Sequence, residues 1–140
     1  MNLIPLCKAR IAVDPPFQFG ITPTGRRSMS DIREAVFEGD RLNAVKIGTS
    51  AADWLVLAGD VGSIDVRMAL RTHDGVLIGL RYWGKLDVAD LSNRTSRVAA
   101  TFDTGDTRYA WLARMQAVGK SRLERDGDHW TVHYDFWELA

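Results

Sequence analysis

The sequence predicts an all-β fold, an antiparallel up-and-down β-barrel of lipocalin-like size with eight to ten strands and at most a short helical turn. Twelve glycines and several turn dipeptides are spread along the 140 residues, and short apolar-rich runs lie between them. Helical periodicity is scarce. So many strands in one short chain must close or stack, because long exposed sheet edges invite aggregation. A barrel of about eight strands leaves room for side chains or for one small ligand.

Turn signals divide the first 59 residues into short segments. The first strand ends at Asp14-Pro15-Pro16, because proline cannot donate to a strand ladder. Residues 17–25 close on the loop signal Thr22-Pro23-Thr24-Gly25. Residues 28–37 allow two interpretations, since Asp31 and Glu34 resemble a helix capping box whereas the following Ala-Val-Phe-Glu-Gly is typical of a strand ending at a turn. Strands are expected over 3–13, 42–47 and 54–57.

The clearest local signal is a β-hairpin over residues 63–84. The Asp74-Gly75 dipeptide between two alternating runs is the strongest short-range hairpin signal. Successive strand side chains point to opposite faces, so the first strand has one apolar face and one charged face. The apolar face carries Ile64, Val66, Met68 and Leu70, and the charged face carries Asp65, Arg67 and Arg71. This charged row forms either a solvated outer wall or the lining of a polar pocket.

The remaining segments alternate between strands and turns. Residues 85–93 are polar and predict a short helical turn or a mobile loop. Residues 97–102 form a strand that stops at a turn rich in Asp and Gly. Residues 109–118 fit a helix by propensity and a strand by alternation. The last strand, residues 129–139, follows the Arg125–Asp128 turn and is rich in aromatic and β-branched residues, as strands prefer.

Composition favours a single β-barrel domain over residues 1–140 in the cytoplasm. Lys plus Arg and Asp plus Glu both number 18, so no overall field draws the protein to nucleic acid or to an anionic membrane. No apolar run reaches the roughly 18 residues of a transmembrane helix, and the N-terminal segment lacks a signal-peptide core. The single Cys7 excludes an intrachain disulfide and a cysteine-based zinc cluster, and we expect a buried, inert thiol.

Several stretches, taken in order, resemble the family called domain of unknown function 3237. They are LIPL, FGITPTGRR, FEGDRL, GTSAADW, SIDVRMALRTHDGVLIGLRYWG and FDTGDTRYAWL, followed by a terminal aromatic strand. The most specific are Ala52-Asp53-Trp54, residues 65–75 and residues 102–112. The resemblance covers nearly the whole chain. It implies a closed β-barrel that forms a homodimer or a higher homo-oligomer, and it supplies no established general reaction.

The chain departs from the pattern of that family in two places. The linker over residues 85–100 is shorter than usual and lacks the aromatic-rich stretch that many members carry. Ala113 stands after Trp111-Leu112 where asparagine is common. If this asparagine contributes to a pocket in relatives, that contact is lost or altered here.

Four charged residues are the candidates for catalysis. Arg67 and Arg71 carry planar guanidinium groups that can bind a carboxylate or carbonyl oxygen, and Asp65 can orient them or act as a base. Asp53, at a predicted barrel mouth, is a second carboxylate that can move a proton, or it only caps a turn. The alternative for the row is an outer face of ion pairs, each worth about 0–1 kcal/mol. We expect the row to face an enclosed cavity and to converge near one barrel end with at least one tryptophan.

Aromatic and basic residues are the candidates for substrate binding. Trp54 and Trp111 each offer a large apolar wall with one N–H donor, and we expect the substrate to lie between them. Tyr109 shares a face with Trp111 if this segment is a strand. Core packing is the alternative for these aromatic residues. The full set of binding candidates is Trp54, Arg81, Tyr109, Trp111 and Arg114.

The sequence predicts no metal and no cofactor. The three histidines, His73, His129 and His133, form no metal-binding pair at helical spacing. The acidic turn at 103–106 lacks the regular spacing of a calcium loop. No nucleophile elbow, phosphate loop or dinucleotide fingerprint occurs. His133 and Asp135 share a face of the last strand, where His133 is either a proton-transfer group or simply exposed.

These patterns support a function hypothesis and an alternative of a different class. The first is a cofactor-independent enzyme of isomerase, cyclase or lyase type, with a barrel pocket for an aromatic or carbonyl-bearing small organic molecule. The alternative is a non-catalytic carrier or sensor barrel that pairs an apolar acid with an arginine. A scaffold domain is a third possibility, and a barrel interior filled entirely by side chains would support it.

Overall fold

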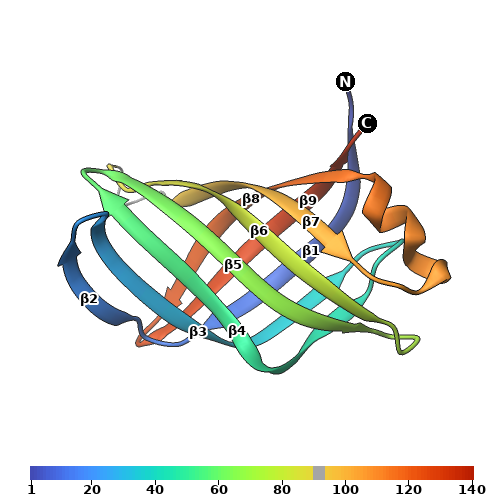
Figure 1. Ribbon diagram of the computed structural model, residues 1–140, viewed down its shortest axis with the longest axis horizontal. Coiled ribbons are helices and arrows are strands. Elements are labelled where there is room, and N and C mark those ends of the chain that lie inside the picture. Colours follow the sequence, from blue (N-terminus) through green and yellow to red (C-terminus); the bar gives the residue numbers. More distant parts are fainter. Residues whose placement is uncertain (90–93) are drawn as a thin grey trace.

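The computed structural model is a closed antiparallel barrel of eight strands with one extra strand and one short 3₁₀ helix, as predicted (Figure 1). It describes residues 1–89 and 94–140. The elements are β1 (Leu3–Val13), β2 (Phe17–Thr22), β3 (Gly25–Glu38), β4 (Ala44–Ala58), β5 (Val61–Thr72), β6 (Leu77–Asp87), β7 (Thr95–Asp103), η1 (Thr107–Arg114), β8 (Gln116–Asp126) and β9 (His129–Leu139).

The barrel closes between β1 and β3. Each strand from β3 to β9 pairs with its sequence neighbour, and β9 then pairs with β1 along nearly its whole length. The second half of β1, from Lys8 to Val13, pairs with the second half of β3 and completes the circle. The first half of β3 pairs instead with β2, which is the extra strand. The segment over 28–37, which the sequence left open between helix and strand, is part of β3.

Alternation along each strand decides which side chains face the interior. In β5 every second residue from Gly62 to Thr72 is buried, and the residues between them are exposed or half-buried. Burying an apolar side chain stabilises the fold by about 1.5–3 kcal/mol, so the apolar face takes the interior. The largest fully buried side chains come from five strands, one loop and the helix, and they pack inside the barrel: Phe37, Phe136, Leu6, Ile11, Leu42, Leu70, Ile78, Leu112 and Val66.

The two ends of the barrel differ. The helix η1 lies across one end, beside the β5–β6 turn (Figure 1). The side chain of Asp106 caps this helix by accepting a hydrogen bond from the Arg108 backbone N–H at 2.9 Å. Leu112 is then buried to 1% exposure, so the helix acts as a plug. At the other end lie the β2–β3, β4–β5 and β8–β9 turns, and none of residues 1–89 and 94–140 forms a helix over it (Figure 1).

Two further segments can be compared with their predictions. Residues 107–114 are a 3₁₀ helix and β8 begins at Gln116, so the segment that fitted both helix and strand contains one of each. Lys85–Asp87 belong to β6, whereas residues 90–93 of the expected loop lie outside the described residues. In the described part of the chain, no helix has the length and apolar character needed to cross a membrane.

Candidate active site

The charged row on β5 lies on the outer wall of the barrel, and the expectation that it lines an enclosed cavity is wrong. Arg67 and Arg71 are exposed, and Asp65 is half-buried with a side chain 48% exposed. The apolar residues that alternate with them take the interior instead. The physical reason is the cost of removing unpaired charges from water, which exceeds any gain from exposing the apolar face.

Part of the row does share a shallow outer groove with a tryptophan. Asp65 and Arg67 line this groove beside Trp54, which is 41% exposed, whereas Arg71 is not among its lining residues. Arg81 donates to Asp65 from the neighbouring strand at 3.2 Å and lies over the Trp83 ring. These contacts are those of a solvated ion-paired wall.

The predicted Trp54–Trp111 sandwich does not exist, because the two rings belong to different parts of the barrel. Trp54 stacks on Phe19 on the outer wall, with 5.8 Å between ring centroids. Trp111 lies on η1 at the closed end, where the Arg41 guanidinium covers its ring at 5.0 Å. Arg114 lines the same outer hollow as Trp111, and Tyr109 is buried with its hydroxyl donating to Asp74 at 2.8 Å. Core packing, the alternative given from the sequence, describes Tyr109 correctly.

The open half of the barrel contains a cavity of about 420 Å³. This volume falls in the range of about 300–1,000 Å³ that small-molecule sites occupy. Its apolar walls come from six strands: Val13, Leu55, Leu57, Ile64, Leu86, Leu123, Trp130 and Val132. Its polar lining comes mainly from β3, β4, β7, β8 and β9: Arg26, Ser28, Ser30, Asp53, Ser96, Ser121 and Tyr134. The filled interior that would have supported the scaffold alternative is not found in this half of the barrel.

Asp53 is the one residue of the predicted catalytic set whose side chain lines this lumen. It lies on β4, directly opposite Ser30 of β3 and Val66 of β5. Its Oδ1 is buried and has no hydrogen-bond partner among the described residues. Burial raises the pKa of the Asp53 carboxyl from 3.8 to about 7. The group is therefore poised between its acid and base forms near neutral pH, which is what general acid–base catalysis requires.

A connected group of hydroxyls lies on another wall of the lumen. The Ser96 and Ser121 Oγ atoms are 2.6 Å apart, and Ser96 Oγ is 2.8 Å from the Tyr134 hydroxyl. The Ser96 backbone N–H also donates to Ser121 Oγ at 3.0 Å. The backbone pairing of β7 with β8 ends at Arg97 and Lys120, so this bond to a side chain comes just after the last backbone pair. Burial raises the pKa of the Tyr134 phenol above its usual range, so it stays protonated.

Cationic and aromatic side chains mark the mouth of the lumen. Arg26 is exposed, Arg94 is half-buried, and no ion pair joins either of them to another described residue. Trp130 lines the mouth from β9, and the Arg125 guanidinium lies over its ring at 4.8 Å from the centroid. A ligand that enters the lumen therefore passes positive charge and an indole face.

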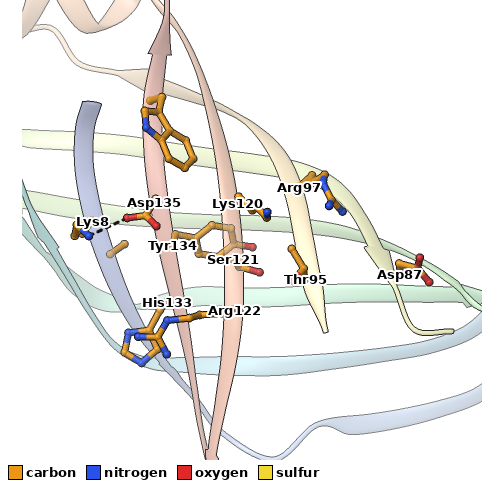
Figure 2. A pocket seen from close by; sticks show the side chains of 12 residues that line it. Lys8, Asp87, Thr95, Arg97, Lys120, Ser121, Arg122, His133, Tyr134 and Asp135 are labelled. Atoms are coloured by element: carbon orange, nitrogen blue, oxygen red, sulfur yellow. Dashed lines mark ion pairs between the residues drawn. The ribbon is translucent and has the colours of Figure 1, made fainter. Parts of the chain in front are cut away.

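A larger hollow of about 660 Å³ lies on the outer face of β1, β7, β8 and β9 (Figure 2). Its walls are charged and open to water, as in the ion pair of Lys8 with Asp135 at 3.3 Å. His133 lines it and binds Glu124 at 2.8 Å, so it is held on the outside. Figure 2 also shows Tyr134 and Ser121 side by side, at the wall that separates this hollow from the lumen. With no buried unpartnered group among its described residues, the hollow is a weaker candidate than the lumen.

Metal-binding and thiol chemistry find little support in the described residues. Across 1–89 and 94–140, no group of three or more His, Cys, Asp or Glu side chains gathers in an arrangement that could hold a metal ion. Cys7 is buried as predicted, and burial raises its pKa to about 12. The thiol is therefore protonated at neutral pH and is a poor nucleophile.

Comparison with known families identifies the chain. A model of the family described as protein of unknown function DUF3237 matches residues 1–139. This protein belongs to the DUF3237 family. Comparison with curated proteins found no match. The family assignment confirms the resemblance that the motifs indicated. No activity comes with the DUF3237 assignment.

Solved structures with the same fold cover this DUF3237 chain almost completely. A beta-barrel like protein from Acinetobacter baumannii AYE is 27% identical, with a TM-score of 0.78 over 99% of this chain and 96% of the other. A protein with unknown function from Clostridium acetobutylicum ATCC 824 is 22% identical, with a TM-score of 0.87 over 100% of both chains. An enzyme from Penicillium herquei is 17% identical, with a TM-score of 0.75 over 99% and 94%.

Sequence reasoning missed the serines and the tyrosine of the lumen. Ser28 and Ser30 lie on a segment that was left open between helix and strand, so their face could not be assigned. A signal for the others was present, because Ser96 alternates with Val98, Ala100 and Phe102 on the apolar face of its strand. Ser121 likewise alternates with Ala117 and Gly119, and Tyr134 with Val132 and Phe136.

Proposed function

We propose that this DUF3237 barrel is a cofactor-independent enzyme that moves a proton on an aromatic or carbonyl-bearing small molecule held in the lumen, with Asp53 as the acid–base group. The lumen combines apolar walls with a few convergent polar groups, as small-molecule sites usually do. Isomerisation, cyclisation and lyase reactions share such a proton transfer as their key step.

The observation that carries the proposal is the unpartnered Oδ1 of Asp53. A buried carboxylate without a hydrogen-bond partner costs free energy of folding. A barrel that only stored an apolar ligand would have no use for this group. The same burial sets the pKa near 7, so the carboxylate can accept a proton and the acid can return it at one pH.

For a ketone the step can be written in full. The Asp53 carboxylate takes a proton from the carbon next to the carbonyl, and the electron pair of that C–H bond moves to form an enolate. Return of a proton to the same carbon regenerates the ketone, and when the enolate is conjugated with a C=C bond, return at the far end of that bond gives a double-bond isomer. In heavy water the returning proton is a deuteron, so the reaction leaves a label even when the product equals the substrate.

The experiment follows this label with 2-tetralone, an aromatic ketone small enough for the cavity. We expect the protein to accelerate deuterium incorporation next to the carbonyl above the buffer rate, as measured by proton NMR. Asp53→Asn should lower the catalysed rate by about 10²–10⁴-fold, the usual contribution of a general base. Binding of 2-tetralone without any catalysed exchange would overturn the enzyme and leave the carrier.

A matched variant separates the lumen from the outer wall. Asp65→Asn makes the same chemical change on β5, outside the barrel. Loss of exchange in Asp53→Asn with retention in Asp65→Asn supports a site in the lumen. An equal loss in Asp65→Asn would locate the chemistry in the outer groove and overturn the proposal.

A further inference from the structure

The three hydroxyls of Ser96, Ser121 and Tyr134 have one O–H donor more than they can use among themselves. Each hydroxyl carries one donor, and two O···O contacts join the three hydroxyls into a hydrogen-bonded chain, called the hydroxyl chain below. Whatever the direction of each bond, two donors fill two contacts and the third remains. No other hydrogen bond of these O–H groups has good geometry within the described residues, although the Ser121 and Tyr82 hydroxyls lie near enough to Tyr134 to influence its pKa. All three residues line the lumen, so the spare donor is available to a ligand there.

Relative acidity decides which hydroxyl keeps the spare donor. A phenol is more acidic than an aliphatic hydroxyl and is therefore the better donor of the two. The O···O distances allow either direction, and on the ground of acidity we assign Tyr134 as the donor to Ser96 and Ser96 as the donor to Ser121. Ser121 Oγ then accepts twice, from the Ser96 hydroxyl and from the Ser96 backbone N–H, and its own O–H is left over. Hydrogen bonds in such a chain polarise one another, which strengthens the last donor.

The opposite wall supplies a different chemistry. Asp53 projects from β4 with its unpartnered Oδ1, and Tyr82 lies between the two groups in the strand order, packed against Tyr134 at 5.1 Å between ring centroids. The charge of Asp53 contributes, after burial, to raising the pKa of Tyr134. The carboxyl and the hydroxyl chain therefore belong to one lumen. A molecule between them can present a C–H or O–H bond to Asp53 and an acceptor oxygen to Ser121.

We propose that Ser121, supported by Ser96 and Tyr134, is the binding site for the oxygen of the substrate, and that the substrate is a compact apolar ring system carrying a carbonyl or a similar acceptor oxygen. This inference rests on the proposed function, because it assumes that the substrate binds in the same lumen. It adds a contact from Ser121 to that from Asp53, and it names the substrate class. In the enolate that the proton transfer forms, negative charge grows on this oxygen. A hydrogen bond from Ser121 becomes stronger at that moment and lowers the barrier.

The experiment compares 2-tetralone with tetralin, which is the same ring system without the oxygen. We expect the protein to bind the ketone about three- to tenfold more tightly than the hydrocarbon, the worth of one buried hydrogen bond. With the carbonyl carbon labelled with ¹³C, its resonance should move downfield on binding, as a carbonyl does when it accepts a hydrogen bond. Ser121→Ala should remove the preference and most of the downfield shift. Ser121→Thr, which keeps the hydroxyl, should retain both.

Two further variants make the test specific. Ser28→Ala removes a hydroxyl that lines the same lumen from β3 and does not belong to the hydroxyl chain. This variant should leave the carbonyl shift unchanged. Tyr134→Phe keeps the Ser121 hydroxyl but removes one hydroxyl from the hydroxyl chain. The downfield shift of the carbonyl resonance should therefore lie between those of the wild type and Ser121→Ala. An unchanged shift in Ser121→Ala, or an equal loss in Ser28→Ala, would overturn the assignment.

Asp53→Asn distinguishes this inference from the proposed function. Lost exchange with a retained carbonyl shift supports both. Retained exchange with a retained shift overturns Asp53 as the base and leaves the oxygen site standing. A shift that disappears in Asp53→Asn but persists in Ser121→Ala shows that the oxygen binds the protonated carboxyl, and overturns the oxygen site.

Discussion

Asp53 and Trp54 are neighbours in sequence, yet their side chains lie on opposite faces of the barrel wall. The Asp53 carboxyl lines the lumen, whereas the Trp54 indole stacks on Phe19 outside, with the Arg27 guanidinium 6.0 Å from its ring. Strand alternation alone produces this separation. The pair therefore cannot act together on one ligand, and each residue must be tested with partners from its own face.

The two faces predict different roles for two tryptophans. Trp130 lines the mouth of the lumen, so Trp130→Ala should weaken binding of 2-tetralone by up to about tenfold, the worth of one aromatic contact. Trp54→Ala should leave the dissociation constant within about twofold, because its ring is outside. Isothermal titration of both variants with the ketone measures the difference. Weaker binding in Trp54→Ala alone would show that the ligand occupies the outer groove.

The raised pKa of Asp53 predicts a specific dependence of stability on pH. In the folded protein the group titrates at about 7, and in the unfolded chain near its ordinary 3.8. Between these values the folded state holds a proton that the unfolded state has released. The stabilising contribution is therefore complete below about pH 4 and is lost as pH rises through 7, to an upper bound of about 4 kcal/mol.

Asp53→Asn removes this titration and serves as the reference. The free energy of unfolding of the wild type should fall relative to that of the variant between pH 5 and pH 8, as measured by urea denaturation at several pH values. The comparison uses the change with pH, because a buried amide has its own cost at every pH. Parallel pH profiles for the two proteins would show that Asp53 titrates normally.

The architecture could be predicted from the sequence because it depends on local signals. Alternation over residues 64–70 and the Asp74-Gly75 turn define a hairpin without any knowledge of the rest of the chain. The number of strands then forces closure. The same alternation also predicts that the charged row faces outward, since the apolar face of a strand takes the interior. Placing Asp65, Arg67 and Arg71 inside required the apolar residues to face water.

The lumen could be predicted only in part because it depends on register between distant strands. Asp53 was found from its own segment, as a carboxylate beside an aromatic residue at a predicted barrel mouth. Ser96 and Ser121 are 25 residues apart and meet because the β7–β8 register places them side by side, just beyond the last paired residues, Arg97 and Lys120. Alternation places each on an apolar face, but which residues face one another across a barrel follows from strand tilt and stagger, which one sequence does not reveal.

The outer position of the charged row predicts small effects on stability. Arg81→Ala removes the ion pair with Asp65, whose side chains are 43% and 48% exposed. The free energy of unfolding should fall by less than about 1 kcal/mol, and the effect should shrink in high salt because exposed pairs are screened. Thermal denaturation at low and high ionic strength measures this. A loss of several kcal/mol would mean that the pair is buried in an assembly of chains, as the predicted homo-oligomer allows.

The close approach of β6 and β7 predicts a large effect at one glycine. A Cβ placed on Gly84 would lie 1.9 Å from the Arg97 carbonyl oxygen and 2.7 Å from the Val98 Cα. These are backbone atoms of a paired strand, so they cannot move without breaking the ladder that leads to Ser96. Gly84→Ala should therefore cost at least about 3 kcal/mol of unfolding free energy or prevent folding. Gly79→Ala is the matched control on the same strand, since its nearest neighbour would be 3.8 Å away, an ordinary contact. Urea denaturation of the two variants should give clearly different midpoints, and equal midpoints would show that β6 and β7 are farther apart in solution.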